Sequence, residues 1–165
     1  MYIRALSCIS PQATFNNEFF TSEPVVHTGT QFMAIEPSYK GVIPNGILRR
    51  MGRSNRMATG AAMPLLEKHR VTGIIIGTTD AGMEDCHRFL NQIVKYDEGT
   101  LTPTGFVQGS PSSVAGGLSL MSKNSGYNIT HSNKGLSFEN CLVDAMMLLE
   151  DGSAQSLLVG GVEEI

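Results

Sequence analysis

The sequence is short of charged residues and of long hydrophobic runs. Charged residues make up 16% of the 165 residues, against 41% hydrophobic residues, and the net charge is only −3. So small a charge gives no strong field toward nucleic acids or membrane surfaces, and neither is an expected partner. The hydrophobic content predicts a single globular domain over residues 1–165, and the weakly charged surface favours burial against a protein partner.

Cysteine, phosphate-binding and targeting patterns are also missing. The three cysteines, Cys8, Cys86 and Cys141, do not form a disulfide framework, and no Cys/His spacing suits zinc. Neither GxGxxG nor GxxxxGK[ST] occurs. The first ten residues lack the apolar stretch of a signal peptide, and no run could span a bilayer. We therefore expect a protein of the reducing cytoplasm, with no metal and no cofactor.

The few charges are unevenly distributed along the chain. No acidic residue lies between Glu36 and Glu67, and no lysine or arginine follows Lys134. The acid-free stretch carries a group of basic residues, namely Lys40, Arg49, Arg50, Arg53 and Arg56. This asymmetry predicts either a basic docking surface or internal ion pairs, and the pattern does not separate the two.

The hydrophobic pattern alternates between the period of a strand and that of a helix. Strands are predicted at residues 2–9, 73–77, 126–132 and 156–159, with a short one near 31–35. Helices are predicted at residues 47–63, after Asp80, at 111–121 and from Ser137 to near Gly152. Strands separated by helices form βαβ units, so we expect an α/β fold with a mixed, mostly parallel sheet flanked by helices.

Three local features of the helices are predicted as well. Pro64 should kink or split the first helix, because proline removes a backbone N–H. Asp80 is the expected cap of the second helix, whose inward face carries Met83, Cys86, Leu90 and Ile93. A turn is expected at residues 96–103.

The stretch from Gly126 to Gly152 combines a short strand, a sharp turn and a long apolar helix. A strand that enters a helix through a tight turn is where many α/β enzymes hold a nucleophile. Gly135 in this turn can take backbone angles closed to other residues. Ser137 is expected to cap the helix that follows.

Three side chains near this turn are candidates for chemistry. His131 could act as a base, although a strand histidine with a satisfied hydrogen bond is the simpler interpretation. Lys134 could be a desolvated amine or an ordinary solvated lysine. Cys141 lies on the apolar face of the helix, where burial favours a core role over a nucleophilic one.

Five motifs occur in an order that resembles a known family. They are CISP at residues 8–11, LRRMGRSNRMATGAA at 48–62, GIIIGTTDAGM at 73–83, SSVAGGLSLMSKNSG at 112–126 and LLVGGVEE at 157–164. Together they resemble the N-terminal half of a β-ketoacyl synthase, in the thiolase-like superfamily of condensing enzymes. The resemblance implies a thiolase-like half-domain, with the family's C-terminal half absent from this sequence.

The resemblance also implies a site, from which this sequence departs. In the family a cysteine at the start of the helix carries the acyl chain, and the spacing places Gly135 at that position, beside His131, Ser132 and Lys134. Asp80 stands where an apolar residue usually lines the acyl pocket. The two further catalytic residues of the family come from its C-terminal half. The resemblance therefore implies no catalytic residue here, and a subunit that does not condense acyl chains by itself.

Three interpretations follow from this comparison. The first is a non-catalytic subunit, similar to chain-length factors, that pairs with an active synthase or with itself through strand 126–132 in fatty acid or polyketide/polyene biosynthesis. Arg49, Arg50, Arg53 and Arg56 could then dock an acyl carrier protein. The second is the N-terminal half of a longer 3-oxoacyl-acyl-carrier-protein synthase with an atypical nucleophile. The third is a structural or binding module without an acyl role.

Overall fold

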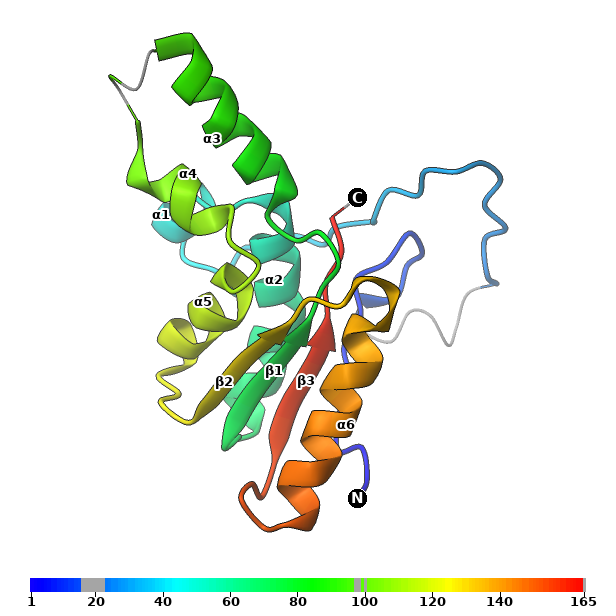
Figure 1. Ribbon diagram of the computed structural model, residues 1–165. Helices are drawn as coiled ribbons and strands as arrows, with labels where there is room; N and C mark the ends of the chain where they lie inside the picture. Colours follow the sequence, from blue (N-terminus) through cyan, green and yellow to red (C-terminus); the bar gives the residue numbers. More distant parts are fainter. Residues whose placement is uncertain (16–22, 97–98, 100, 165) are drawn as a thin grey trace.

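The computed structural model describes residues 1–15, 23–96, 99 and 101–164, and within them it has three strands in one sheet (Figure 1). The elements in chain order are α1 (Asn45–Leu48), α2 (Arg53–Lys68), β1 (Gly73–Gly77), α3 (Met83–Tyr96), α4 (Pro103–Gln108), α5 (Ser113–Ser122), β2 (Tyr127–His131), η2 (Lys134–Leu136), α6 (Ser137–Glu150) and β3 (Leu157–Gly161). The strands are parallel, in the order β2-β1-β3. The predicted α/β class is confirmed.

β1 is the central strand and is buried along its whole length. Its Ile75 pairs with Ile129 of β2 on one side and with Val159 of β3 on the other. Gly77 ends β1 where a Cβ atom would lie 2.8 Å from the backbone of Ser137. The absence of a side chain at Gly77 therefore lets the first turn of α6 approach the end of the sheet closely.

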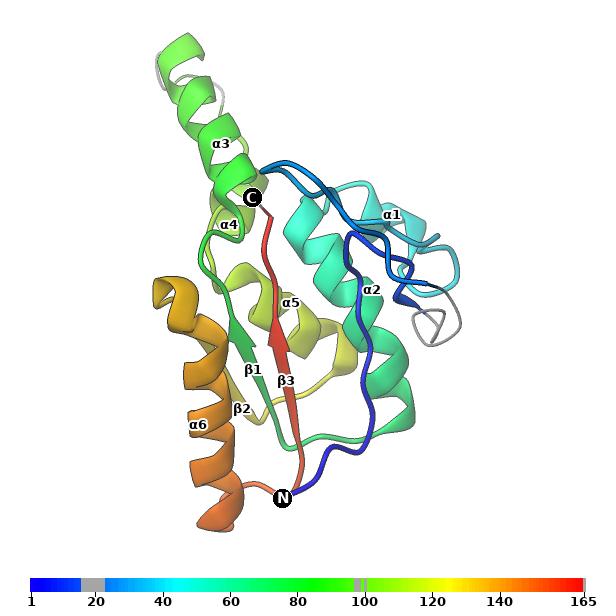
Figure 2. The ribbon, with the colours of Figure 1, turned by 90° about the vertical axis from the view of Figure 1, so that its right-hand side faces the viewer.

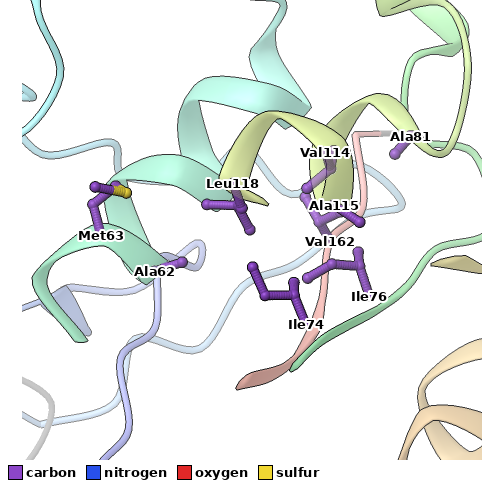
Figure 3. Close-up of a cluster of buried hydrophobic side chains, with 9 residues drawn as sticks. All are labelled: Ala62, Met63, Ile74, Ile76, Ala81, Val114, Ala115, Leu118 and Val162. Carbon is purple, nitrogen blue, oxygen red and sulfur yellow. The ribbon is translucent and has the colours of Figure 1, made fainter. Parts of the chain in front are cut away.

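Helices cover both faces of the sheet (Figures 1 and 2). On one face Ile74 and Ile76 of β1 pack with residues of α5 and α2, forming the larger part of the core (Figure 3). The buried members of this cluster are Ala62, Met63, Ile74, Ile76, Ala81, Val114, Ala115, Leu118 and Val162. On the other face Ile75 packs against Cys141 and Ala145 of α6. The alternating isoleucines of β1 thus join both helical layers to one sheet.

α6 is apolar on more than one side. Cys141 and Ala145 face the sheet and are buried, as the helical period predicts. Large apolar side chains on other sides of the helix are exposed, namely Leu142, Val143, Met146 and Met147. The outer face of α6 is therefore an uncovered apolar surface among the described residues.

Two predicted strands are not formed. Residues 2–9 and 31–35 have no regular secondary structure, and the backbone bond from the N–H of Ile35 to the oxygen of Ser10 (2.8 Å) joins the two regions. Tyr2 and Ile3 are 85% and 83% exposed. An alternating pattern needs a neighbouring strand to become a ladder, and the described residues provide none for this segment.

The first predicted helix, residues 47–63, is two helices. α1 ends at Leu48, and α2 begins only at Arg53, because the intervening chain is held elsewhere: the N–H of Gly52 donates to the side chain of Gln108 (3.0 Å). Pro64 was expected to kink or split the helix, yet α2 continues through it to Lys68. The packing of Ala62 and Met63 against the sheet stabilises this part of α2.

α3 and α4 also differ from the expectation. The predicted inward face of α3 is largely uncovered, since Met83 is 37% and Leu90 51% exposed. α4 was not predicted; it begins at the end of the expected turn at residues 96–103, and positions 97, 98 and 100 lie outside the described residues. None of the helices in the described ranges has the length and apolar character needed to cross a membrane.

Candidate functional site

A pocket of about 340 Å³ lies at the carboxyl end of the sheet. It is lined by the segments that follow the three strands, through Thr79, Asp80, Lys134, Gly135, Ser137, Phe138 and Glu163. The carboxyl ends of parallel strands are where open α/β sheets bind ligands. The sequence singled out Asp80, Lys134 and Gly135 for this region, and it missed Thr79, Phe138 and Glu163 as site residues.

Glu163, in the segment after β3, binds the segment that follows β1. Its carboxylate accepts hydrogen bonds from the backbone N–H groups of Thr79 (2.8 Å) and Asp80 (3.3 Å). The hydroxyl of Thr79 donates to the backbone oxygen of Lys134 (3.0 Å). The segments after β1, β2 and β3 are therefore joined by two successive hydrogen-bonded links. The signal for Glu163 was present in the sequence as the last part of LLVGGVEE.

Gly135 lines the pocket at its exposed surface. A Cβ atom built at this position meets no heavy atom within 4 Å. Gly135 does not use the backbone angles that only glycine adopts readily, and the left-handed residue of the turn is Lys134, with φ of 53°. Neither the space around position 135 nor its backbone conformation requires a glycine. The absence of a side chain there therefore affects the chemistry of the pocket and not the folding of the turn.

Ser137 is buried and its hydroxyl is fully engaged. It accepts a hydrogen bond from the N–H of Asn133 (2.8 Å) and lies within donating distance of the backbone oxygens of Thr78 (2.9 Å) and Lys134 (2.6 Å). Ser137 was expected to cap α6, but it is the first helical residue and its side chain makes no capping bond. Its hydroxyl fixes the turn and is not a free nucleophile.

His131 and Cys141 do not line the pocket, and neighbouring residues hold both side chains. Nε2 of His131 lies 3.0 Å from a carboxylate oxygen of Asp144, which also accepts a hydrogen bond from the hydroxyl of Tyr127 (3.0 Å). The thiol of Cys141 donates to the backbone oxygen of Ser137 (3.1 Å), and burial raises its pKa. This geometry matches a hydrogen-bonded strand histidine and a core cysteine.

The remaining predicted residues lie near the pocket without contacts that suggest chemistry. Asp80 is half-buried at the lining and was expected to cap the next helix. Its backbone oxygen, and not its carboxylate, accepts the N–H of Met83 at the start of α3 (3.1 Å). Ser132 is exposed in the segment between β2 and η2. Within the described ranges, no group of three or more His, Cys, Asp or Glu side chains could hold a metal ion.

The arginine group divides into two pairs. Arg56 binds the carboxylate of Glu36 through two nitrogens (2.7 and 2.8 Å), and this pairing lowers the pKa of Glu36. Arg53 lies 3.9 Å from Glu36 and 3.8 Å from Glu84. Arg49 and Arg50, between α1 and α2, are exposed, and no described acid pairs with them. The sequence left open whether the basic residues form a docking surface or ion pairs within the chain. Arg53 and Arg56 form ion pairs within the chain.

Solved structures share this fold. The chain aligns with the "Ketosynthase (ApeO) in Complex with its Chain Length Factor (ApeC) from Xenorhabdus doucetiae" at a TM-score of 0.74 and 20% identity, over 92% of this chain and 62% of the other. It aligns with "The ishigamide ketosynthase/chain length factor" at a TM-score of 0.59 and 25% identity, over 74% of this chain. It spans only 37% of that second chain.

The sequence comparison agrees with the structural one. No curated protein matches the chain. The family described as "Beta-ketoacyl synthase, N-terminal domain" matches residues 32–164, which is most of the sequence and includes every residue lining the pocket. The five motifs of the sequence predicted this family, and the match confirms it. The chain therefore belongs to the β-ketoacyl synthase N-terminal domain family.

Proposed function

We propose that the chain is a non-catalytic ketosynthase-like subunit, similar to chain-length factors, that pairs with an active β-ketoacyl-acyl-carrier-protein synthase. The pathway would be fatty acid or polyketide/polyene biosynthesis. The observation that carries the proposal is Gly135, which lines the pocket at the carboxyl end of the sheet and has no side chain. An acyl chain cannot be transferred to a residue that offers no nucleophilic atom.

The neighbouring nucleophiles support the same proposal. The hydroxyl of Ser137 is buried and hydrogen-bonded, and the thiol of Cys141 is buried on the sheet side of α6 with a raised pKa. A protonated, enclosed thiol attacks poorly, because the thiolate is the reactive form. His131 is held by Asp144. We infer that the pocket corresponds to a ketosynthase site without a group prepared for covalent catalysis.

The pairing is supported by the edge of the sheet. β2 is bonded to β1 on one side and has no strand on the other among the described residues. Both similar structures are of a ketosynthase with a chain length factor. An open edge strand can be extended by a strand of a second subunit. We propose that a ketosynthase partner, or a second copy, pairs along residues 126–132.

Arg49 and Arg50 are exposed and could contact a further partner, an acyl carrier protein. They are separate from Arg53 and Arg56, whose charges are paired with acids of this chain. Unpaired guanidinium groups attract an acidic protein surface and raise its association rate. We propose them as the docking position for an acidic acyl carrier protein, which would bind more weakly after Arg49→Glu and Arg50→Glu.

Pairing is tested by co-purification with ketosynthases encoded in the neighbouring reading frames. Native mass spectrometry should show a complex of defined stoichiometry between this chain and one such ketosynthase. The matched control is an unrelated ketosynthase of similar size. A chain that stays monomeric with every neighbouring ketosynthase, and with itself, contradicts the proposal.

The alternative, a longer synthase with an atypical nucleophile, is favoured by one observation. The amine-bearing residue Lys134 lines the pocket and adopts the left-handed backbone conformation (φ 53°), which is uncommon for a residue with a side chain. Intact-mass spectrometry after incubation with acyl-carrier substrates separates the two functions. We expect no added mass, whereas an acyl adduct mapped to Lys134, His131 or Cys141 would establish the alternative.

A further inference from the structure

Three side chains at the open edge of the sheet form one hydrogen-bonded network. The carboxylate of Asp144, on α6, accepts the hydroxyl of Tyr127 (3.0 Å) and lies 3.0 Å from Nε2 of His131. Tyr127 and His131 are the first and last residues of β2. Alternate residues of a strand share a face, so both side chains lie on the α6 side of the sheet with Ile129 between them. We call Tyr127, Asp144 and His131 the edge network.

The edge network is only partly covered by this chain. β2 pairs with β1 on one side and has no strand on the other among the described residues (Figure 1). The side chains of His131 and Asp144 are 22% and 20% exposed, and Tyr127 is 40% exposed. A strand that pairs along β2 would place its own side chains about 5 Å from those of β2. Pairing would therefore remove the remaining water from the edge network.

The ring of His131 has one nitrogen that this chain leaves unbonded. Nε2 faces the carboxylate of Asp144, and no described residue forms a hydrogen bond with Nδ1. A bond to an ionised carboxylate holds the proton of the neutral ring on Nε2, so the second proton enters at Nδ1. Histidine is the side chain that ordinarily changes charge between pH 5 and pH 8. The edge network can therefore change its charge near neutral pH.

The other titratable groups around His131 do not carry a compensating charge. The hydroxyl of Tyr127 and the thiol of Cys141 are the neighbours on β2 and α6, and burial followed by the charge of Asp144 raises the pKa of the thiol. Burial and the bond to Asp144 also raise the pKa of Tyr127. Both groups are therefore uncharged at neutral pH, and Asp144 is the charge that faces the ring.

The neighbouring segments add no charge to the edge network either. β1 brings Gly77 alongside His131, and the N–H of Thr78 donates to the backbone oxygen of His131 (3.0 Å). The nearest basic residue along the chain is Lys134, which is exposed and lines the pocket. The charge of the edge network is therefore set by Asp144 and by the protonation of His131.

The charge of the network determines how much free energy is needed to cover it. With a neutral His131 ring the network has one negative charge, and with a protonated ring it is a neutral ion pair. Removing an unpaired charge from water costs more than removing a charge that is paired and hydrogen-bonded. A partner that covers this edge therefore binds more tightly to the protonated form.

We propose, resting on the proposed function, that the edge network is a proton-linked switch, in which protonation of His131 strengthens pairing with the partner ketosynthase along β2. Asp144 is the positioning residue: it holds the ring at the edge and supplies the opposite charge. By linkage, formation of the complex takes up a proton, and the affinity increases as the pH falls from about 8 to about 6.

The test measures the dissociation constant of the complex with the neighbouring ketosynthase at about pH 6 and about pH 8. The wild-type chain should bind about fivefold or more tightly at the lower pH. His131→Gln has an amide that can donate to Asp144 but cannot change charge, so its two values should agree within about twofold. His27→Gln is the matched control, because His27 is an exposed histidine before α1, and it should keep the wild-type dependence.

Proton uptake on binding gives a second readout, which a merely structural role of the network would not change. Calorimetry in buffers of different ionisation enthalpy should show uptake for the wild-type chain at about pH 7. Asp144→Asn keeps the shape of the side chain but removes the opposite charge, so the uptake should be lost. Tyr127→Phe keeps the ion pair and should retain the uptake. Circular dichroism at each pH checks that every variant is folded.

The outcomes separate the switch from the proposed function. A complex whose affinity is the same at both pH values, or depends on pH equally in His131→Gln, overturns the switch and leaves the proposed function intact. The same holds for proton uptake that Asp144→Asn retains in full. Absence of any complex at either pH contradicts the proposed function itself, and the switch with it.

Discussion

At the scale of single residues, position 135 has no side chain although the pocket leaves room for one. Gly135 stands at the pocket, just before the start of α6, with open space where a side chain would lie. The first N–H groups of a helix and its dipole stabilise negative charge, so a thiol placed there would ionise more readily. The local fold is therefore suited to a thiolate that the sequence does not supply.

Gly135→Cys should produce a thiol that reacts quickly with iodoacetamide at neutral pH. The free energy of unfolding should change by less than about 0.5 kcal/mol, because the new Cβ atom meets no neighbour. Cys141 should stay unmodified in the folded protein, since it is buried and its pKa is raised. Peptide mapping by mass spectrometry measures the rates, and Gly135→Ser is the control. If the thiol introduced by Gly135→Cys reacts more slowly than that of the exposed Cys8, this interpretation of the site is wrong.

Glu164 is a second residue of interest, because its surroundings change the pKa of its carboxyl group. One carboxylate oxygen accepts the N–H of Gly82 (2.8 Å), and the other is buried with no hydrogen-bond partner among the described residues. Burial, together with the nearby carboxylates of Glu84 and Asp85, raises its pKa above the usual 4.5. The folded protein therefore binds this proton more tightly than the unfolded chain does.

The stability of the protein should accordingly depend on the charge of Glu164. The contribution of the bound proton is complete below the unfolded pKa and is lost as the pH rises through the raised folded pKa. Glu164→Gln should therefore raise the urea midpoint at neutral pH, and the gain should shrink to zero as the pH falls below about 4.5. Urea unfolding from about pH 4 to about pH 8 measures this, with the exposed Glu67→Gln as control. A gain that is independent of pH would show that the charge is not its cause.

At the scale of elements, the loop before β2 lies close to the backbone that leads into β1. A Cβ atom at Gly126 would lie 2.0 Å from the backbone oxygen of Thr72, just before β1. Backbone atoms cannot move aside as a flexible side chain can. The edge strand therefore joins the sheet only because this position has no side chain.

Gly126→Ala should lower the free energy of unfolding by about 2 kcal/mol, because β2 must shift away from β1. Gly116→Ala is the matched change in α5, where a Cβ atom meets nothing within 4 Å. That substitution should be neutral or stabilising by up to about 1 kcal/mol, through its effect on helix propensity. Chemical denaturation of both variants measures the difference. Equal effects would mean that the contact with Thr72 does not restrict β2.

At the scale of the whole molecule, two apolar surfaces remain uncovered among the described residues, one on α3 and α4 and one on the outer face of α6. The α6 surface carries four large apolar side chains that no described residue buries. Surfaces of this kind favour association in solution. Both surfaces agree with the small charged fraction of the chain.

Met147→Lys should reduce non-specific association of the isolated chain without unfolding it. Met147 is 64% exposed, so the substitution should change the free energy of unfolding by less than about 0.5 kcal/mol. Binding of a hydrophobic dye and light scattering at increasing concentration should both decrease. Lys123→Met, on the exposed end of α5, is the reverse control. Undiminished dye binding would place the accessible apolar surface elsewhere, most directly on α3 and α4.

The sequence pattern correctly predicted the strands and helices that pack against other parts of the chain. It failed for the segments that do not pack in this way. GIIIG and the stretch from Tyr127 to Ala145 gave the correct strands and helix, because both faces of β1 and one face of α6 are buried here. Residues 2–9 have the alternation of a strand but no partner strand, and α3 has the stripe of a buried helix although α4 covers it only in part. Periodicity reports which surface is apolar, and it does not report what covers it.

The pocket was predictable in position and only partly in detail. The turn after β2 and the approach to α6 follow from the strand–helix pattern, which singled out Lys134 and Gly135. The links through Glu163 could not be inferred, since they join backbone groups of Thr79 and Asp80 to a carboxylate more than eighty residues away. Such bonds depend on how the segments meet, which local patterns do not specify.

The open space at position 135 has a consequence for the history of the gene. Two of the four glycine codons, GGU and GGC, become cysteine codons through a single base change, so from either of them one point mutation would place a thiol at this position without a steric obstacle from the surrounding fold. The space, the turn and the helix start that a thiol would use are all present. No steric barrier therefore separates this chain from one that presents a thiol at the pocket.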